Sequence, residues 1–463
     1  MPVSDTKPEY KKFLSRWCMT RDCVEGSAEV KKGRTKYLPK PNPEDVSSEN
    51  DQRYDDYIER ANFVGFTSST LDGMVGMVFR KPLEVELQKS IQYLEQNANG
   101  GGITLDQLTR GIVGELLQTA RLGLLVDYPQ APKGLTKAEV QALGLTANIL
   151  EYPAEAVLNW QTTMVGSVKK LSLVVLKEKS KELSDDGFSY IEKDQYRVLR
   201  LRDSVYYQEI WNDKNELQEV SEPRKSDGSR WSEIPFIFAG ARNNDECIDK
   251  APLYDIATIN IAHYRNSADY EESCYMVGQP TPYISGLTQG WVDENMKNGV
   301  MLGSRRAMLL PDGGQAGLLQ ADPNQMPEKG MELKEQQMIK IGARIIQDST
   351  GQETAEAAKI RFAGQNSKLG VIVGNTESAL LQCFEWCMWF MGGEGENLIE
   401  INKDFYERTA DPQMVMASIQ LLDRGIIAVS DLQDDLRAKG VIKQERTNED
   451  IADEAESNMG DML

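Results

Sequence analysis

The residues that most often carry catalysis are scarce or unfavourably spaced in this chain. The only histidine is His263, so a Ser-His-Asp or Cys-His arrangement could be built only around it. It stands beside Tyr264 in a segment of helical periodicity, where a packing or surface role is favoured. No Gly-x-Ser-x-Gly elbow and no Gly-x4-Gly-Lys-Ser/Thr loop occurs, and the glycines within residues 97–107 lack the following lysine. The sequence therefore predicts neither nucleophilic catalysis nor nucleotide binding.

Metal chemistry finds little support either. Six cysteines are scattered along the chain, and only Cys383 and Cys387 share a helix face at a spacing of four. Zinc would need two more ligands nearby, so buried small apolar side chains are the favoured interpretation. Carboxylate pairs such as Asp434 and Asp435 carry no information in a chain with 72 acidic residues. We predict no cofactor and no metal, while a nuclease that holds two metal ions on dispersed acids stays open as an alternative.

Two basic clusters could contact phosphate. Lys340 and Arg344 lie four residues apart on one face of a predicted helix, and copies of that helix around a channel would form rings of positive charge. On a single helix, however, such residues are usually surface charge. The other cluster consists of Lys31, Lys32, Arg34, Lys36 and Lys40. For these residues we favour a solvated loop or ion pairs between subunits over contact with DNA.

The overall charge argues against a tight nucleic-acid binder. The 463 residues carry a formal net charge of −20, whereas phosphate neutralisation by basic residues supplies most of the affinity of such binders. A protein past which DNA slides is still compatible with this acidity, as is an abundant protein that acidity keeps soluble. No run of about 18 apolar residues and no secretory leader is present, so we expect no membrane span and a reducing cytoplasmic setting with free thiols.

The first half of the chain changes from helical to strand-like periodicity. A polar stretch reaches about Lys81, residues 87–120 then have helical spacing, and Thr104 can cap the second part of that segment. Residues 123–129 predict a short buried strand. Between residues 171 and 240 four segments alternate apolar and polar residues, which predicts an antiparallel meander. These segments are residues 171–179, 195–203, 204–213 and 233–240.

The second half predicts long helices around an irregular insert. Ala257, Ile261, Tyr264 and Ala268 form an apolar stripe in the first helix, with Pro252 in its first turn. Residues 279–326 are rich in Gly and Pro and predict a small separate module. In the second helix the apolar stripe is Met331, Met338, Ile341 and Ile345, and the polar stripe is Lys329, Glu332, Gln336, Lys340 and Arg344.

A third long helix is predicted from Ser367 to Met391, where two glycines end it. Two short helices follow within residues 412–440, and an acidic tail begins at Glu445. The two short helices superficially suggest a helix-turn-helix. The second of them carries Asp431, Asp434 and Asp435, whereas a DNA reader would present arginines and amides there. A packed helical cap is therefore favoured.

The order of these elements resembles the portal proteins of tailed double-stranded DNA bacteriophages. Local phrases also resemble one portal subfamily, and they recur in the same order along nearly the whole chain. No single phrase encodes chemistry, so their collinear order carries the resemblance. The phrases occupy residues 53–82, 123–129, 233–244, 251–286 and 351–369.

The resemblance implies an α+β portal-type fold with a mixed wing that contains the meander. Two stem helices would flank a small α/β clip, and a long wing helix and a helical crown would follow. The implied parts are the wing in residues 1–248, stem helices in 249–278 and 327–347, the clip in 279–326, a tunnel loop in 348–358, the wing helix region in 359–408, and the crown and acidic tail in 409–463.

The resemblance also implies a function without catalysis. A ring, usually of about twelve copies, would stand at one capsid vertex after assembly in the host cytoplasm, with no membrane contact. It would pass double-stranded DNA without sequence preference, and it would contact the terminase large subunit, a head-tail adaptor, the major capsid protein and scaffolding protein. The alternative is another phage head protein or a scaffold-like assembly protein. A mass measurement would distinguish this alternative from a portal ring.

Candidate site residues follow from these implied parts. The channel candidates are Lys334, Lys340, Arg344, Asp348, Thr350, Gln352 and Glu353. The candidates for docking the motor or adaptor are Trp291, Arg305 and Arg306. The implied tunnel loop carries acids and no base before Lys359, which disfavours a grip on phosphate by the loop itself.

Overall fold

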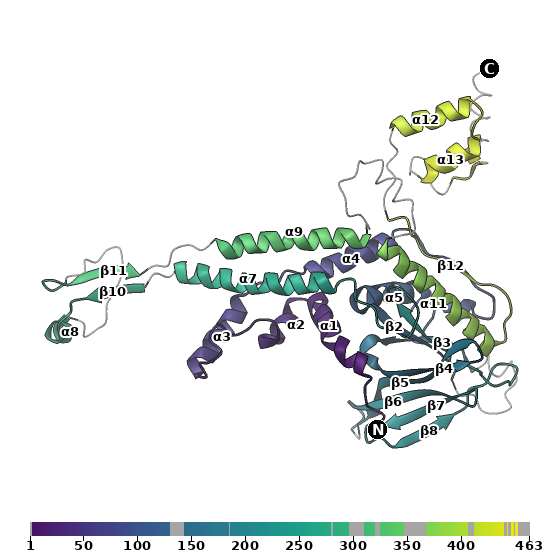
Figure 1. The fold of residues 1–463 in the computed structure, drawn as a ribbon, viewed down its shortest axis with the longest axis horizontal. Helices are drawn as coiled ribbons and strands as arrows, with labels where there is room; N and C mark the ends of the chain where they lie inside the picture. Colours follow the sequence, from purple (N-terminus) through teal and green to yellow (C-terminus); the bar gives the residue numbers. More distant parts are fainter. Residues whose placement is uncertain are drawn as a thin grey trace. The chain divides into compact units, whose positions relative to one another are not determined.

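The computed structural model describes most of the chain, which forms two units, Met1–Ile401 and Asn402–Leu463 (Figure 1). Helices and antiparallel sheets occur together, so the predicted α+β class is confirmed. The described residues are 2–129, 143–184, 186–278, 281–295, 310–319, 325–346, 367–405, 412–438, 442, 446–448 and 450–451.

Four helices occupy the N-terminal stretch in which the sequence suggested only a polar segment. Their buried faces use aromatic residues, Thr and Met rather than runs of aliphatic residues, as Trp17, Tyr54 and Met74 show, and this weakens the periodic signal. Ser47 caps the third helix by accepting a hydrogen bond from the Asn50 backbone N–H. The helices are α1 (Pro8–Glu25), α2 (Ser27–Lys32), α3 (Ser48–Arg60) and α4 (Phe66–Val78).

Only the second part of residues 87–120 forms an α-helix, although the spacing predicts helical structure in both parts. Thr104 begins α5 (Leu105–Thr119) with a complete capping box, in which it exchanges hydrogen bonds with Gln107. The earlier part forms only the 3₁₀ turn η2 (Gln92–Glu95). There Leu94 is buried, but the short apolar segment makes no continuous stripe.

A three-stranded antiparallel sheet follows α5, in the order β3-β2-β9. The predicted buried strand is β2 (Arg121–Asp127) in its centre, between β3 (Asn148–Pro153) and β9 (Phe236–Gly240). Placing β9 in the meander was wrong. Gly123 of β2 has no side chain, and the Phe236 ring occupies that space, since a Cβ on Gly123 would lie 2.4 Å from Phe236 Cζ.

The meander itself is a separate five-stranded antiparallel sheet in sequential order. Three of its strands match the predicted alternating segments. Its core-facing side chains include Trp160, Val174, Val198 and Tyr206, all nearly inaccessible. The strands are β4 (Val157–Val165), β5 (Val168–Leu183), β6 (Tyr190–Arg202), β7 (Val205–Asn212) and β8 (Leu217–Ser221).

The third long helix is α11 (Lys368–Met391), close to its predicted bounds. Ser367 caps its start and Gly392, in the left-handed conformation, ends it. Cys383 and Cys387 are fully buried in this helix. After α11, β12 (Leu398–Glu400) pairs with β1 (Glu84–Glu86).

The second unit contains the two predicted short helices, α12 (Pro412–Asp423) and α13 (Val429–Ala438). Asp431 accepts a hydrogen bond from the Ala428 backbone N–H at the start of α13, and Asp434 pairs with Arg437 at 2.6 Å. The acids of α13 therefore serve helix capping and pairing.

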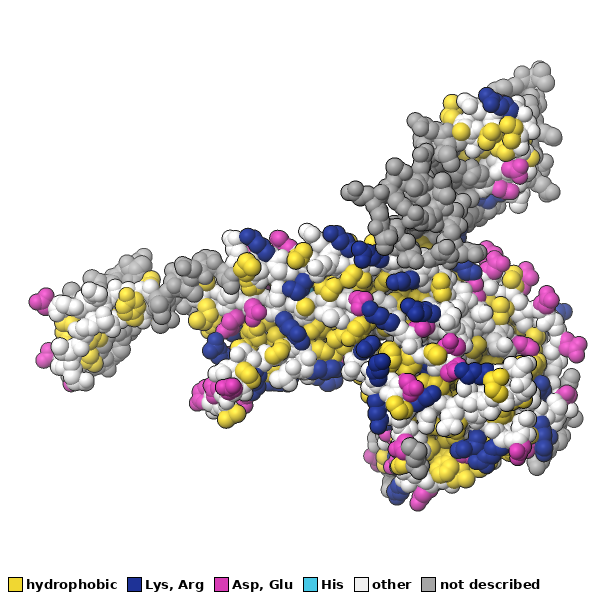
Figure 2. Space-filling model, viewed as in Figure 1, with side chains coloured by type: hydrophobic (Ala, Val, Ile, Leu, Met, Phe, Trp, Pro, Cys, Tyr) yellow, Lys and Arg dark blue, Asp and Glu magenta, His cyan; other side chains and the backbone are white. Residues whose placement is uncertain are grey.

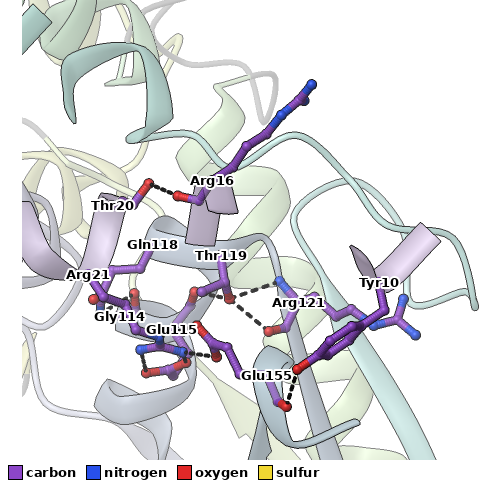
Figure 3. A network of polar contacts seen from close by, with 10 residues as sticks. All are labelled: Tyr10, Arg16, Thr20, Arg21, Gly114, Glu115, Gln118, Thr119, Arg121 and Glu155. Carbon is purple, nitrogen blue, oxygen red and sulfur yellow. Dashed lines mark hydrogen bonds and ion pairs between the residues drawn. The ribbon is translucent and has the colours of Figure 1, made fainter. Parts of the chain in front are cut away.

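A partly buried polar network attaches α1 to α5 and to the sheets (Figure 3). The Arg21 guanidinium donates to the carboxylates of Glu115 on α5, at 2.7 and 2.9 Å, and of Glu155, at 2.6 and 2.9 Å. Glu155 belongs to η3 (Ala154–Ala156), and the Tyr10 hydroxyl donates to its backbone carbonyl. Since α1 also packs against α7 (Tyr254–Gly278), this network connects the sheets to the long helix.

Glu151 on β3 faces α5 near Gly111. Burial, and then the nearby Glu115, raise the pKa of the Glu151 carboxyl from 4.5 to about 7. The folded protein therefore holds a proton there that the unfolded chain releases, and its free energy of unfolding should fall as the pH rises from 4.5 to 7. We expect Glu151→Gln to stabilise the protein by about 2 kcal/mol at pH 8 and hardly at pH 4.5. Urea unfolding at both values checks this, and an equal effect at both would contradict it.

Candidate functional site

The predicted pair of long helices exists, and its members lie side by side (Figure 1). They are α7 and α9 (Met326–Ile346), and together we call them the stem. Their bounds fall close to the predicted ones, except that Pro252 precedes α7 instead of lying within its first turn. Between them in sequence stands the described part of the insert. It contains β10 (Thr281–Ser285), α8 (Gln289–Asn295) and β11 (Gln315–Leu319), and β10 pairs with β11.

The buried face of α7 contains the predicted stripe and three buried polar residues. Ala257, Ile261, Tyr264 and Ala268 are each at most 3% exposed. Of the polar residues, Asn260, His263 and Ser267, only His263 was given a possible packing role from the sequence. No periodic pattern in the sequence distinguishes them from surface polar residues.

Two of these polar side chains hold α7 against the segment that leads into α4. The Asn260 carboxamide accepts from the backbone and hydroxyl of Thr67, at 3.2 and 3.0 Å, and donates to the Val64 carbonyl at 2.9 Å. The Ser267 hydroxyl donates to the Asn62 carbonyl at 2.6 Å and accepts from the Asn62 backbone N–H at 3.0 Å. Satisfied buried polar groups fix a helix in one register.

His263 lies between the two stem helices. Its side chain is 4% exposed, and Nε2 lies 3.3 Å from Glu335 Oε1 on α9. The Phe66 ring meets the imidazole edge to face. Burial lowers the pKa of His263, although Glu335 acts in the opposite direction. The lone histidine thus packs the stem, as one of the sequence interpretations proposed.

The two predicted faces of α9 are confirmed. Met338 and Ile345 of the apolar stripe are at most 3% exposed, and Met331 and Ile341 are partly buried. Gly342 allows close packing, because a Cβ there would touch Thr70 of α4 and Ile256 of α7. All members of the predicted polar stripe are exposed, and these are Lys329, Glu332, Gln336, Lys340 and Arg344.

The charge of this exposed face is positive in its second half. Between residues 336 and 345 the only charged residues are Lys340 and Arg344, and within the described residues neither has an ion-pair partner. They stand one turn apart, about 6 Å along the axis. Lys334, the third channel candidate on α9, is partly buried and its Nζ lies 3.4 Å from the Gly330 carbonyl.

Acids of α7, by contrast, are engaged by α3. The Tyr57 hydroxyl donates to Asp269 at 2.6 Å, and Arg60 pairs with Glu272 at 2.5 Å. Arg53 also contacts Glu272. Coulombic attraction between phosphate and the stem would therefore centre on α9.

Three large apolar side chains on α9 are exposed, which periodicity did not predict. Met326 is 73%, Leu333 57% and Ile339 66% exposed. Figure 2 shows hydrophobic and basic side chains intermixed along the stem surface. Large apolar side chains that stay exposed together with polar neighbours are the usual mark of a surface that another molecule covers.

The basic cluster at residues 31–40 is neutralised within the chain, whereas the sequence favoured a solvated loop or ion pairs between subunits. Lys32 pairs with Glu29, Arg34 with Asp55, Lys36 with Asp22 and Lys40 with Asp51. Lys31 donates to the Glu59 carbonyl. This region therefore has little unpaired charge to attract phosphate.

The remaining site candidates divide into described and undescribed residues. Trp291 lies on α8 and is partly buried. Six candidates lie outside the described residues, namely Arg305, Arg306, Asp348, Thr350, Gln352 and Glu353. Among the described residues no three His, Cys, Asp or Glu side chains gather as a metal site. The described helices also include none long and apolar enough to span a bilayer.

Comparison with known proteins adds one family model and several solved structures. Residues 252–391 match a domain of unknown function, DUF4055, which includes both stem helices and α11. No curated protein matches the chain.

The solved structures come from a gene transfer agent particle. A chain in the neck of the native particle, computed with C12 symmetry, is 13% identical, with 88% of this chain and 98% of that chain covered and a TM-score of 0.40. For a chain in the neck of the empty particle, computed with C6 symmetry, the match covers 83% of this chain and 92% of that chain, with 13% identity and a TM-score of 0.40. For a chain from the virion of the native particle, the match covers 80% of this chain and 88% of that chain, also with 13% identity and a TM-score of 0.40.

Proposed function

We propose that this protein is the portal subunit of a tailed phage, a structural component without catalysis that forms a ring around the DNA passage at one capsid vertex. The observation that carries the proposal is the stem. Two long helices pack side by side through apolar stripes, a small module is inserted between them in sequence, and one outer face presents Lys340 and Arg344.

An exposed apolar side chain of α9 supports assembly into a ring. Ile339 is more than half exposed in one copy and lies about a third of a turn away from the face of Lys340 and Arg344, so a neighbouring stem would remove it from water. A contact between two different surfaces of identical subunits closes into a ring when the rotation per subunit allows it. In that ring the polar stripe of α9 lines the bore.

The charges suit a conduit better than a binding site. With a net charge of −20 the subunit repels DNA at long range, while the isolated positive residues of α9 attract phosphates briefly as they pass. Such contacts carry no sequence information. DNA can therefore move through the ring without being held.

The insert between α7 and α9 would project from one end of the ring as its clip. There it would dock the terminase large subunit during packaging and the head-tail adaptor afterwards, with Trp291, Arg305 and Arg306 as the candidate contacts. The acid-rich segment at residues 348–358, with Asp348, Thr350, Gln352 and Glu353, would face the passing DNA. The wing would contact the major capsid and scaffolding proteins.

Mass measurement of the purified protein tests the proposal. A closed ring of roughly twelve copies of the 52.0 kDa chain has a mass near 600 kDa, and class-averaged electron micrographs should show a central hole with cyclic symmetry. A protein that stays a single subunit at every concentration is not a portal. Degradation of DNA on addition of magnesium or manganese would instead support a nuclease.

A further inference from the structure

The hairpin of β5 and β6 extends beyond the sheet to which it belongs. β4 pairs with β5 only up to Leu176, and β7 pairs with β6 only from Gln195 onward. The last five pairs of the hairpin, from Lys179–Asp194 to Leu183–Tyr190, therefore have none of the described strands on either side. We call residues 179–194 the arm. A two-stranded ribbon is at best marginally stable alone in water.

The described residues at the tip of the arm are nevertheless hydrogen-bonded to one another. Asp186 accepts hydrogen bonds from the Ser184 hydroxyl and the Phe188 backbone N–H. The Ser189 backbone N–H and hydroxyl both bond to Ser184 Oγ, and Gly187 supplies the positive φ of 73° that the turn requires. This turn fixes the backbone at Phe188, which lowers the entropic cost of ordering the chain there for a contact.

Four large apolar side chains are exposed on or beside this tip. Phe188 is 94%, Tyr190 65%, Leu183 57% and Ile191 51% exposed. Aromatic anchors on a rigid projection are typical of the residues that dominate protein interfaces. A surface loop with no partner would gain solubility from polar residues at these positions, so the arm has the composition of a contact element.

We propose that the arm of each copy of this chain pairs with the β8 edge of the next copy. This inference rests on the ring proposed above. β8 is the outermost strand of the five-stranded sheet, and its outer edge has no pairing partner among the described strands. Its five residues match the length of the unflanked part of β5. Pairing of the two edges continues the sheet from subunit to subunit through main-chain hydrogen bonds.

Hydrophobicity favours this partner. Leu217 and Val220 of β8 are 47% and 51% exposed and can cover the apolar tip of the arm. Apolar pairs across neighbouring strands stabilise a sheet.

Cross-linking tests the pairing directly. Lys181→Cys and Gln218→Cys would be combined in a chain whose exposed Cys247 and Cys274 are changed to Ser, and assembled rings would be treated with a short bis-maleimide. We expect a ladder of covalent multimers up to the full ring, and no ladder from either single variant. Control rings carry Lys181→Cys with Lys89→Cys, a distant exposed position. An equal ladder from these rings, or none from the test pair, overturns the proposal.

A shortened arm provides a second measurement. Replacing residues 180–193 by an Asn-Gly turn removes the tip and keeps the five-stranded sheet, and Phe188→Ser removes only the anchor. We expect rings of either variant to dissociate at protein concentrations about tenfold or more above those for the unmodified ring. Unchanged dissociation overturns the arm contact and leaves the portal proposal intact, whereas an unmodified chain that forms no ring overturns both.

Discussion

Replacing Lys340 and Arg344 together by Glu should leave ring assembly intact and reduce the DNA held by the particle by about tenfold or more. Both side chains are exposed on α9 and are the only charges in the second half of that helix. The double substitution reverses two rings of positive charge, and the bore then repels DNA over its whole length. The measurement is nuclease-protected DNA per particle, together with the salt dependence of duplex binding by the purified ring.

The matched control for this variant is Lys32→Glu with Lys89→Glu, which makes the same change in net charge at exposed positions away from the stem. It should package DNA as the unmodified protein does. Unaltered packaging and an unaltered salt slope in the α9 variant would show that this face does not line the passage. Loss of the ring would place these residues in a subunit contact instead.

Ile339→Asp is expected to abolish the ring while the subunit stays folded. Ile339 is 66% exposed in one copy, so the change should cost the single chain less than about 1 kcal/mol of unfolding free energy. In a ring the new carboxylate would be buried against the neighbouring stem without a partner, which is far more costly. Light scattering would then report one chain where the unmodified protein gives a ring, and circular dichroism would report unchanged helix content.

Val46→Asp is the control, because Val46 is 90% exposed and lies outside the stem. It should assemble normally. Leu333→Asp should also assemble normally, because Leu333 lies on the face of Lys340 and Arg344 and not on that of Ile339. Persistence of the ring in the Ile339→Asp variant at the concentrations used for the unmodified protein would refute a subunit contact through this face of α9.

Elements whose signal is local were predictable. Helices α5, α7, α9 and α11 follow from apolar stripes at helical spacing together with caps such as Thr104 and Ser367. Strands β5 to β7 follow from alternation and turn residues. The basic face of α9 also follows from the sequence, because residues four apart on a helix must share a side.

Elements whose signal depends on partners were not predictable. Cys23 and Tyr54 mark the buried faces of α1 and α3 only once the stem packs on them. β9 leaves the meander because Gly123 makes room for Phe236, a match between residues more than a hundred positions apart. The pairing of residues 31–40 with acids, and the projection of the arm, likewise depend on which segments meet.

The sequence by itself determined the order of the elements, the polar and apolar faces of the stem, and the absence of the motifs for nucleotide binding and nucleophilic catalysis, because helical and strand periodicities act over a few residues. Only the tertiary structure decided which polar groups are buried, which charges are neutralised and which apolar residues stay exposed. Those properties are set by the proximity of segments far apart in the chain, since burial and ion pairing depend on distance in space and not on spacing in sequence.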